Sequence, residues 1–127
     1  MILIIGALLG FISIAFGACA EHGLRVTVSE EHFHLLMTAV RYNQIHAMVI
    51  TALGLATLNR GKLADMPTLR LSALLFIIGT ILFSFSIYFS IVFNIPSLVN
   101  VTPVGGTTIM VAWLLLLITG ILVKKRI

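Results

Sequence analysis

Six side chains capable of chemistry lie close together in the first half of the chain. They stand at the end of one apolar stretch and at the start of the next: Glu21, His22, Arg41, Tyr42, Asn43 and His46. Carboxylate, imidazole and guanidinium groups can pair with one another, bind an ion or relay a proton. Which of these they do depends on the elements that hold them.

Long apolar stretches make up most of the chain. They cover residues 2–20, 38–58, 69–93 and 103–123, and each has about the 20 residues that a helix needs to cross a bilayer. Of the 127 residues, 60% are hydrophobic and 9% are charged, which lies outside the range of soluble proteins. We therefore predict an all-α membrane protein, a single domain (1–127) of four transmembrane helices.

The basic residues predict the orientation of these helices. With four spans, both chain ends and the middle loop share one side, which carries Arg60, Lys62, Arg70, Lys124, Lys125 and Arg126. The other side carries only Arg25 and Arg41. Since the positive side normally faces the cytoplasm, we predict a multi-pass inner (plasma) membrane protein with both termini cytoplasmic. The basic residues stand beside the spans rather than among aromatic residues, so no nucleic-acid partner is expected.

A short amphipathic segment precedes the second span. Ser29 can cap a helix whose first turn carries Glu30 and Glu31, where negative charge is favourable. Apolar and polar residues then recur on opposite sides at helical spacing. The pattern predicts a short interfacial helix over about 29–37, which either bends into the second span or runs into it continuously.

The first span has one side without bulky residues. Gly6, Gly10, Ser13 and Gly17 follow at steps of four, three and four, so they stack on one face of a helix. Such a face lets another helix backbone approach closely, and close packing is a main source of helix association in lipid. We predict that this helix-packing face contacts a helix of the same chain or of a partner, and that it is one docking face of the protein.

Charged residues at the membrane boundary need partners. Glu21 follows Gly17 by four residues and so continues the small face of the first span. Arg41, at the start of the second span, lies at similar depth. Because an unpaired charge near lipid is costly, we predict an ion pair between Glu21 and Arg41.

Three interpretations of the polar cluster stay open. In the first, it is a hydrogen-bonded group that holds the helices in register, as polar residues often do in membranes. In the second, His22 and His46 supply two axial nitrogens to a metal or haem. In the third, Glu21 and His46 relay a proton or bind a transported solute.

Motifs for catalysis and metal binding are missing. The sequence contains no HExxH or CxxC spacing, and Cys19 is its only cysteine. We therefore expect no enzyme, no catalytic residue, no metal site and no cofactor.

Four segments resemble those of one protein family, in the same order. They are 17–24, which ends in His22-Gly23-Leu24; 39–47, which contains Arg41-Tyr42 and His46-Ala47; 82–88; and 102–106, which ends in Gly105-Gly106. The family is the small bacterial inner-membrane group called domain of unknown function 423, which is related to the eukaryotic transmembrane protein 256. The resemblance covers nearly the whole chain and implies four helices in the inner membrane, with no established activity. Where the family has Gly-Ala before His-Gly-Leu, this chain has Ala20-Glu21.

The sequence favours a role in association over one in chemistry. We expect a small accessory or scaffold subunit that acts through helix–helix contacts. Its expected partners are the lipid bilayer and either a larger membrane complex or further copies of the chain. The alternative is a small oligomeric transporter or channel that uses Glu21 and His46.

Overall fold

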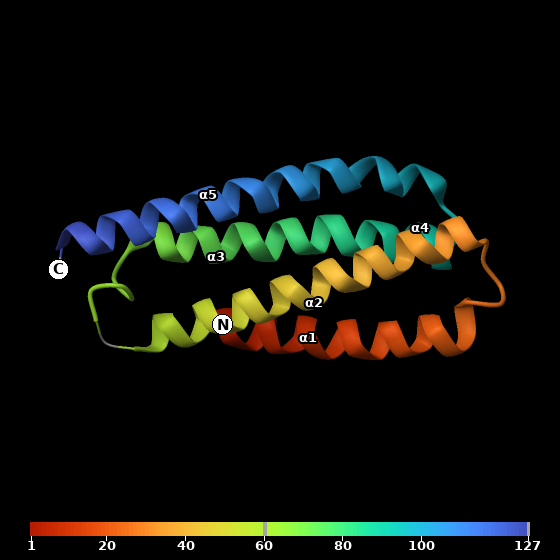
Figure 1. Ribbon diagram of the computed structural model, residues 1–127, viewed down its shortest axis with the longest axis horizontal. Coiled ribbons are helices and arrows are strands. Elements are labelled where there is room, and N and C mark those ends of the chain that lie inside the picture. Colours follow the sequence, from red (N-terminus) through yellow and green to blue (C-terminus); the bar gives the residue numbers. More distant parts are fainter. Residues whose placement is uncertain (60, 127) are drawn as a thin grey trace.

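The computed structural model describes residues 1–59 and 61–126, which form four long helical rods lying side by side (Figure 1). In chain order, the first rod is α1 (Ile2–Cys19) with a π-helical turn (Ala20–Leu24); the second is α2 (Glu30–Leu58); the third is α3 (Pro67–Thr80) continued by a π-helical segment (Ile81–Phe85) and α4 (Ser86–Val92); the fourth is a 3₁₀ turn (Pro96–Val101) leading into α5 (Thr102–Arg126). The described residues contain no strand, so the prediction of an all-α fold is confirmed.

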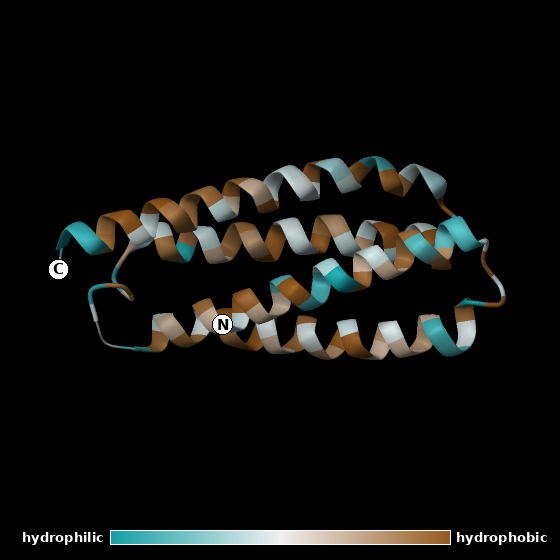
Figure 2. Cartoon of the chain, in the orientation of Figure 1, coloured by the Kyte–Doolittle hydropathy of each residue, from teal (hydrophilic) through white to brown (hydrophobic). Residues whose placement is uncertain are grey.

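Within the described residues, three rods are long and apolar enough to cross a membrane: Ile2–Leu24, Pro67–Val92 and Pro96–Arg126. α2 differs because polar side chains interrupt its apolar sequence, as the hydrophilic colour midway along it shows in Figure 2. Two of these side chains, Asn43 and His46, are buried among the helices. α2 is less apolar than its neighbours, and these two of its polar side chains face protein.

The amphipathic segment before the second span is not a separate helix. Residues 29–37 form the cap and first turns of α2, which runs unbroken over Glu30–Leu58. Ser29 caps it as predicted, since its hydroxyl oxygen accepts a hydrogen bond from the His32 amide (3.2 Å). No glycine or proline occurs in the helix before Gly54, so nothing in the chain separates the two predicted elements.

The small face of the first span packs against α2 of the same chain. A Cβ atom added at Gly6 would lie 2.7 Å from the Thr51 backbone nitrogen, and one at Gly54 would lie 2.6 Å from the Leu3 backbone. Real Cβ atoms do not approach so closely, so Gly6 and Gly54 could not carry a side chain while the two backbones touch at these points. The expectation that this face docks a partner is wrong at Gly6, because α2 already covers it.

The two helices pack less tightly farther along the same face. A Cβ atom at Gly10 would lie 3.8 Å from the Ala47 Cβ, and one at Gly17 would lie 3.2 Å from a Val40 methyl group. Ser13, between them, is buried and donates a hydrogen bond to the Gly10 carbonyl oxygen (2.7 Å). The face therefore lies toward α2 along its whole length, with room left near the middle.

The third rod and α5 form a second close pair. A Cβ atom at Gly79 would lie 3.0 Å from the Gly105 carbonyl oxygen, and one at Gly105 would meet the Phe83 backbone. Ser72 also donates a hydrogen bond to the Ala112 carbonyl oxygen (2.9 Å). Hydrogen bonds between helices help to hold them together in lipid, where water does not compete for the donor.

The two pairs meet where α2 lies against the third rod. Ile50, Leu69 and Phe76 are buried at the centre of this contact. Toward the α1–α2 loop, the Phe16 ring stacks on the Tyr88 ring with 4.1 Å between centroids. α1 and α5 therefore lie on the outside of the bundle, and α2 and the third rod lie between them (Figure 1).

Adjacent glycines at the start of α5 offer a matched test of close packing. Gly105→Ala should lower the free energy of unfolding by about 1–3 kcal/mol, because the new methyl group meets the Phe83 backbone. Gly106→Ala should leave it unchanged or slightly higher, because a Cβ there lies 3.7 Å from the Phe83 ring. Thermal unfolding of detergent-solubilised protein, followed by circular dichroism, measures both. Equal losses in the two variants would contradict this packing.

Candidate functional site

Glu21 forms its ion pair within its own turn of helix. Its Oε2 atom lies 2.8 Å from Nη1 of Arg25, and the Arg25 guanidinium also lies over the Phe33 ring, 5.3 Å from its centroid. The predicted pair between Glu21 and Arg41 is therefore wrong. Arg25 follows Glu21 by four residues on the same side of the helix, so this pair needs no contact between helices. Both side chains are exposed, and such pairs contribute little to stability.

Arg41 lies on the outside of α2 and makes no ion pair with a described residue. It lines a hollow of about 310 Å³ between α1 and α2. Glu21, His22 and Gln44 line the same hollow. The structure thus gathers the outward polar residues around one opening, as their positions in the sequence suggest, but it leaves the guanidinium free to bind something else.

Asn43 points the other way, into the bundle. It is fully buried, and its Nδ2 group donates a hydrogen bond to the Tyr88 hydroxyl (3.2 Å). One turn away, Ser84 donates to the Ala39 carbonyl oxygen (2.9 Å). The Oδ1 atom of Asn43 and the hydroxyl of Thr80 are buried without a partner among the described residues. The two hydrogen bonds, from Asn43 to Tyr88 and from Ser84 to Ala39, hold α2 in register against the third rod.

His46 is buried one turn farther along α2. Its Nδ1 atom lies 2.7 Å from the Tyr42 carbonyl oxygen. A carbonyl oxygen can only accept, so Nδ1 donates the hydrogen bond. The ring is therefore fixed by its own helix.

An aromatic cluster crosses the bundle around His46. Its members are Tyr42, His46, Phe76, Phe83 and Trp113. Tyr42 stacks on Phe83 with 4.5 Å between centroids, and the Trp113 ring meets Phe76 edge-on at 5.0 Å. Trp113 is nevertheless 45% exposed, and its indole N–H makes no hydrogen bond to any residue that the structure describes. The cluster thus links α2, the third rod and α5, and part of its Trp113 member is exposed.

The six residues of the predicted polar cluster separate into two groups. Glu21, His22 and Arg41 face outward, Asn43 and His46 face inward, and Tyr42 lies between them. The contacts of Gly6 and Gly17 set the register of α1 against α2, which places His22 and His46 about 11 residues, or about 16 Å, apart along the bundle. The two imidazoles cannot serve one metal or haem. Within residues 1–59 and 61–126, no three His, Cys, Asp or Glu side chains are placed to hold a metal ion.

Sequence reasoning missed the partners of the inward group. Thr80, Ser84 and Tyr88 follow at steps of four on the third rod, which is the signal for one polar face of a helix. That face meets Ala39 and Asn43, which follow at the same step on α2. From this shared spacing, the sequence could have predicted that the two faces pack against each other. No sequence pattern of this kind indicates that Trp113 contacts Phe76.

Long apolar rods that pack through glycine contacts and buried hydrogen bonds define an all-α integral membrane protein. The chain belongs to the family described as "Protein of unknown function (DUF423)", whose model matches residues 16–106. The matched range includes both the outward and the inward polar groups. The family resemblance inferred from the sequence is confirmed.

Relatives with membrane-protein names cover most of the chain. It is 34% identical over 109 residues to a UPF0382 membrane protein of Haemophilus influenzae, covering 85% of this chain and 83% of the relative. It is 31% identical over 124 residues to the UPF0382 inner membrane protein YgdD of Escherichia coli K12, covering 98% and 92%. Identity to the UPF0382 membrane protein YwdK of Bacillus subtilis is 26% over 119 residues, covering 94% of each. No solved structure matches the chain.

Tyr88→Phe tests how much the hydrogen bond from Asn43 to the Tyr88 hydroxyl contributes to stability. Without the hydroxyl, the Nδ2 group is left unpaired in the interior, so the free energy of unfolding should fall by about 1–2 kcal/mol. Tyr42→Phe is the matched control, because Tyr42 is partly exposed and its hydroxyl bonds to no described residue. Thermal unfolding in detergent compares them. If both variants lose the same stability, the hydrogen bond does not hold the helices.

Proposed function

We propose that the protein is a small accessory or scaffold subunit of the inner membrane that acts through helix–helix contacts. The name of the Escherichia coli relative supports the inner membrane. Most described residues lie in the four rods, which leaves little chain outside a bilayer to bind a soluble substrate.

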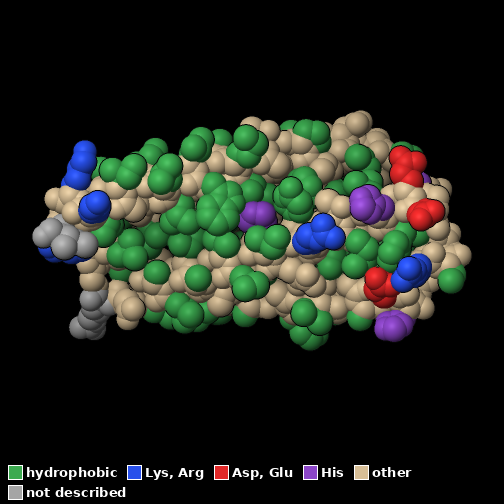
Figure 3. Space-filling model, viewed as in Figure 1, with side chains coloured by type: hydrophobic (Ala, Val, Ile, Leu, Met, Phe, Trp, Pro, Cys, Tyr) green, Lys and Arg blue, Asp and Glu red, His purple; other side chains and the backbone are tan. Residues whose placement is uncertain are grey.

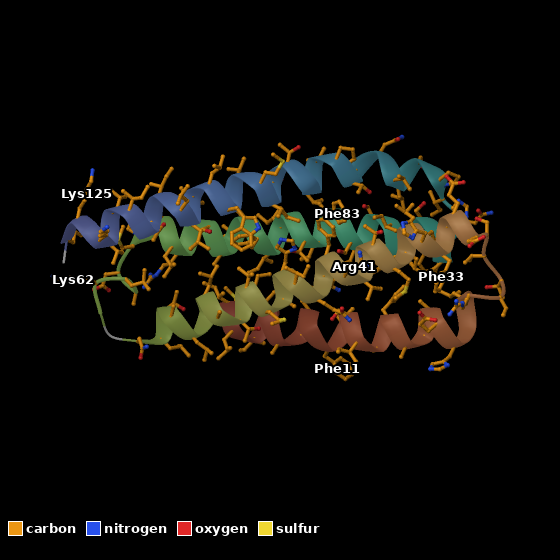
Figure 4. The ribbon with its side chains drawn as sticks, viewed as in Figure 1. Phe11, Phe33, Arg41, Lys62, Phe83 and Lys125 are labelled. Atoms are coloured by element: carbon orange, nitrogen blue, oxygen red, sulfur yellow. The ribbon has the colours of Figure 1, made fainter. Side chains whose placement is uncertain are left out.

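In this proposal all four rods span the membrane and both termini lie in the cytoplasm. α2 packs against α1 and α3, so it shares their depth. Lys62 and Lys125 lie at one end of the bundle (Figure 4), and the acidic side chains visible in Figure 3 gather at the other. The end rich in Lys and Arg is the one expected on the cytoplasmic side.

Trp113 is the main support for a docking role. It lies near the middle of α5 with 45% of its surface exposed, and Phe76 and His46 hold its ring in place. At that depth a bilayer offers neither water nor headgroups to accept a hydrogen bond from the indole N–H. A polar side chain on a helix of another protein would supply the acceptor.

The surface around Trp113 suits a partner helix. Met110, Leu114 and Leu117 are exposed at helical spacing on the same side of α5. A rigid tryptophan surrounded by apolar residues resembles the anchors that contribute most to many interfaces. We therefore infer that the partner lies along α5, rather than on the small face of α1.

Trp113→Phe should release the partner when the native complex is extracted from its own membrane in a mild detergent. The substitution keeps an aromatic ring but removes the N–H donor, so the amount of co-purifying protein should fall several-fold. Quantitative mass spectrometry of affinity-purified, tagged chain measures the loss.

Phe11→Leu is the matched control, because Phe11 is an exposed aromatic residue that projects from the outer rod α1 (Figure 4). It should leave the co-purifying protein unchanged. Equal recovery of the partner protein with both variants would show that the docking surface does not include Trp113. Recovery of the wild-type chain alone, from membranes in which it is expressed at its native level, would refute the accessory role.

The alternative, a small oligomeric transporter or channel that uses Glu21 and His46, has one favourable observation. His46 is an ionisable side chain buried near the middle of the bundle, where such groups often serve transport. Against it, Glu21 is exposed, paired with Arg25 and about 10 residues, or about 15 Å, farther along the bundle. One proton or solute cannot pass directly between groups so far apart.

Flux measurements distinguish the two functions. Purified protein in lipid vesicles should move protons and small solutes no faster than empty vesicles do. A flux that His46→Gln or Glu21→Gln abolishes, with the thermal midpoint of unfolding unchanged, would replace the accessory role with transport. Tyr42→Phe serves as the control for a nearby change that leaves both groups intact.

A further inference from the structure

Two adjoining hollows follow the outside of the contact between α1 and α2. One part is a hollow of about 710 Å³ lined mainly by small and apolar residues, among them Gly10 and Phe11. The other part is the hollow of about 310 Å³ beside Arg41. Ile14 and Gln44 line both, so the two hollows adjoin each other. We refer to the whole as the α1–α2 groove.

The two parts of the α1–α2 groove differ in polarity. Arg41 supplies a positive charge at one end, and no described carboxylate neutralises it because Glu21 is bonded to Arg25. Gln44 and His22 line the same end and can donate further hydrogen bonds. The groove therefore complements a molecule with an anionic head and an apolar tail.

Arg41 lies nearer the middle of the bundle than the end of the apolar part of α1 does. Gly17 faces Val40, so Arg41 is level with about residue 16, about 5 Å inside the end of α1 at Cys19. Figure 4 also shows Arg41 away from both ends of the bundle, unlike the two labelled lysines. An exposed guanidinium at this depth is costly in hydrocarbon unless an anion meets it. Its long side chain can reach toward the lipid phosphates, which are the anions that a bilayer supplies.

We propose that the α1–α2 groove binds one anionic phospholipid from the leaflet at the α1–α2 loop. Its phosphate pairs with Arg41 and accepts a hydrogen bond from Gln44. One acyl chain lies along the apolar part, where Gly10 leaves space beside Ala47. The groove follows α2 from Arg41 to Leu55, about 21 Å, whereas one leaflet of hydrocarbon is about 15 Å deep. It is thus long enough for a full chain.

The charge of the site selects among headgroups. A zwitterionic phospholipid carries its own cation, which competes with Arg41 for the phosphate. A headgroup with a net negative charge has no such competitor, and a guanidinium can bind it through paired hydrogen bonds. Phosphatidylglycerol should therefore bind more tightly than phosphatidylcholine.

Native mass spectrometry of the full chain in detergent tests this preference by titration with each lipid. Arg41→Gln should weaken the first phosphatidylglycerol about tenfold or more, because a charge-assisted hydrogen bond is lost, and should remove the preference over phosphatidylcholine. Arg70→Gln is the matched control, since Arg70 is an exposed arginine at the opposite end of the bundle. It should change neither affinity.

A second pair of variants tests the apolar part. Ala52 is exposed and lines the groove, so Ala52→Leu should narrow it without disturbing the core and weaken both lipids several-fold. Ala15→Leu adds the same bulk to an exposed position of α1 and should have no effect. The thermal midpoint of unfolding confirms that all variants are folded.

Three results would overturn the proposal. One is unchanged phosphatidylglycerol affinity in both Arg41→Gln and Ala52→Leu. Another is binding of glycerol 3-phosphate as tight as that of the lipid, which would show a simple anion site. The last is a wild-type dimer that Ala52→Leu dissociates while the number of bound lipids stays the same, which would show that a second copy fills the groove.

Discussion

Direct contact between helix backbones is the constraint on which the rest of this bundle depends. Apolar helices gain little from leaving lipid for one another, so close packing must hold them together. Gly6 and Gly54 allow that contact between α1 and α2, and Gly79 and Gly105 allow it between the third rod and α5. In each outer helix the small residues lie at the contact with its inner neighbour. Its bulky residues are left to face outward, which is why α1 and α5 are the most exposed rods.

The inner helices are held by a different interaction. Asn43, Ser84 and Ser72 place polar groups between helices, each bonded to a neighbouring rod. In a medium without water these hydrogen bonds fix the rotation and register of a helix, which apolar contacts alone leave free. The same interaction accounts for part of the composition of α2. Its buried Asn43 bonds to Tyr88 on the third rod, whereas Arg41, on its outer side, makes no ion pair with a described residue.

Both proposals come from groups that this arrangement leaves unsatisfied. One is the indole N–H of Trp113, a residue 45% exposed near the middle of α5; the other is the guanidinium of Arg41, whose backbone is level with a point about 5 Å inside the end of α1. Neither has a partner among the described residues. Hydrocarbon can satisfy neither, but a partner helix can accept from the first and a lipid phosphate can pair with the second. Glu21, by contrast, has its counter-ion on its own helix and needs nothing from outside.

The sequence by itself determined the helical rods, the Ser29 cap and the small face of α1, because apolar length, capping and glycine spacing are local properties of the chain. Only the tertiary structure decided which polar groups meet. It paired Glu21 with Arg25 and bonded Asn43 to Tyr88, a partner 45 residues away. Such pairings depend on how each helix is rotated about its axis, and a helix that is apolar on nearly every side carries little periodic signal of that rotation.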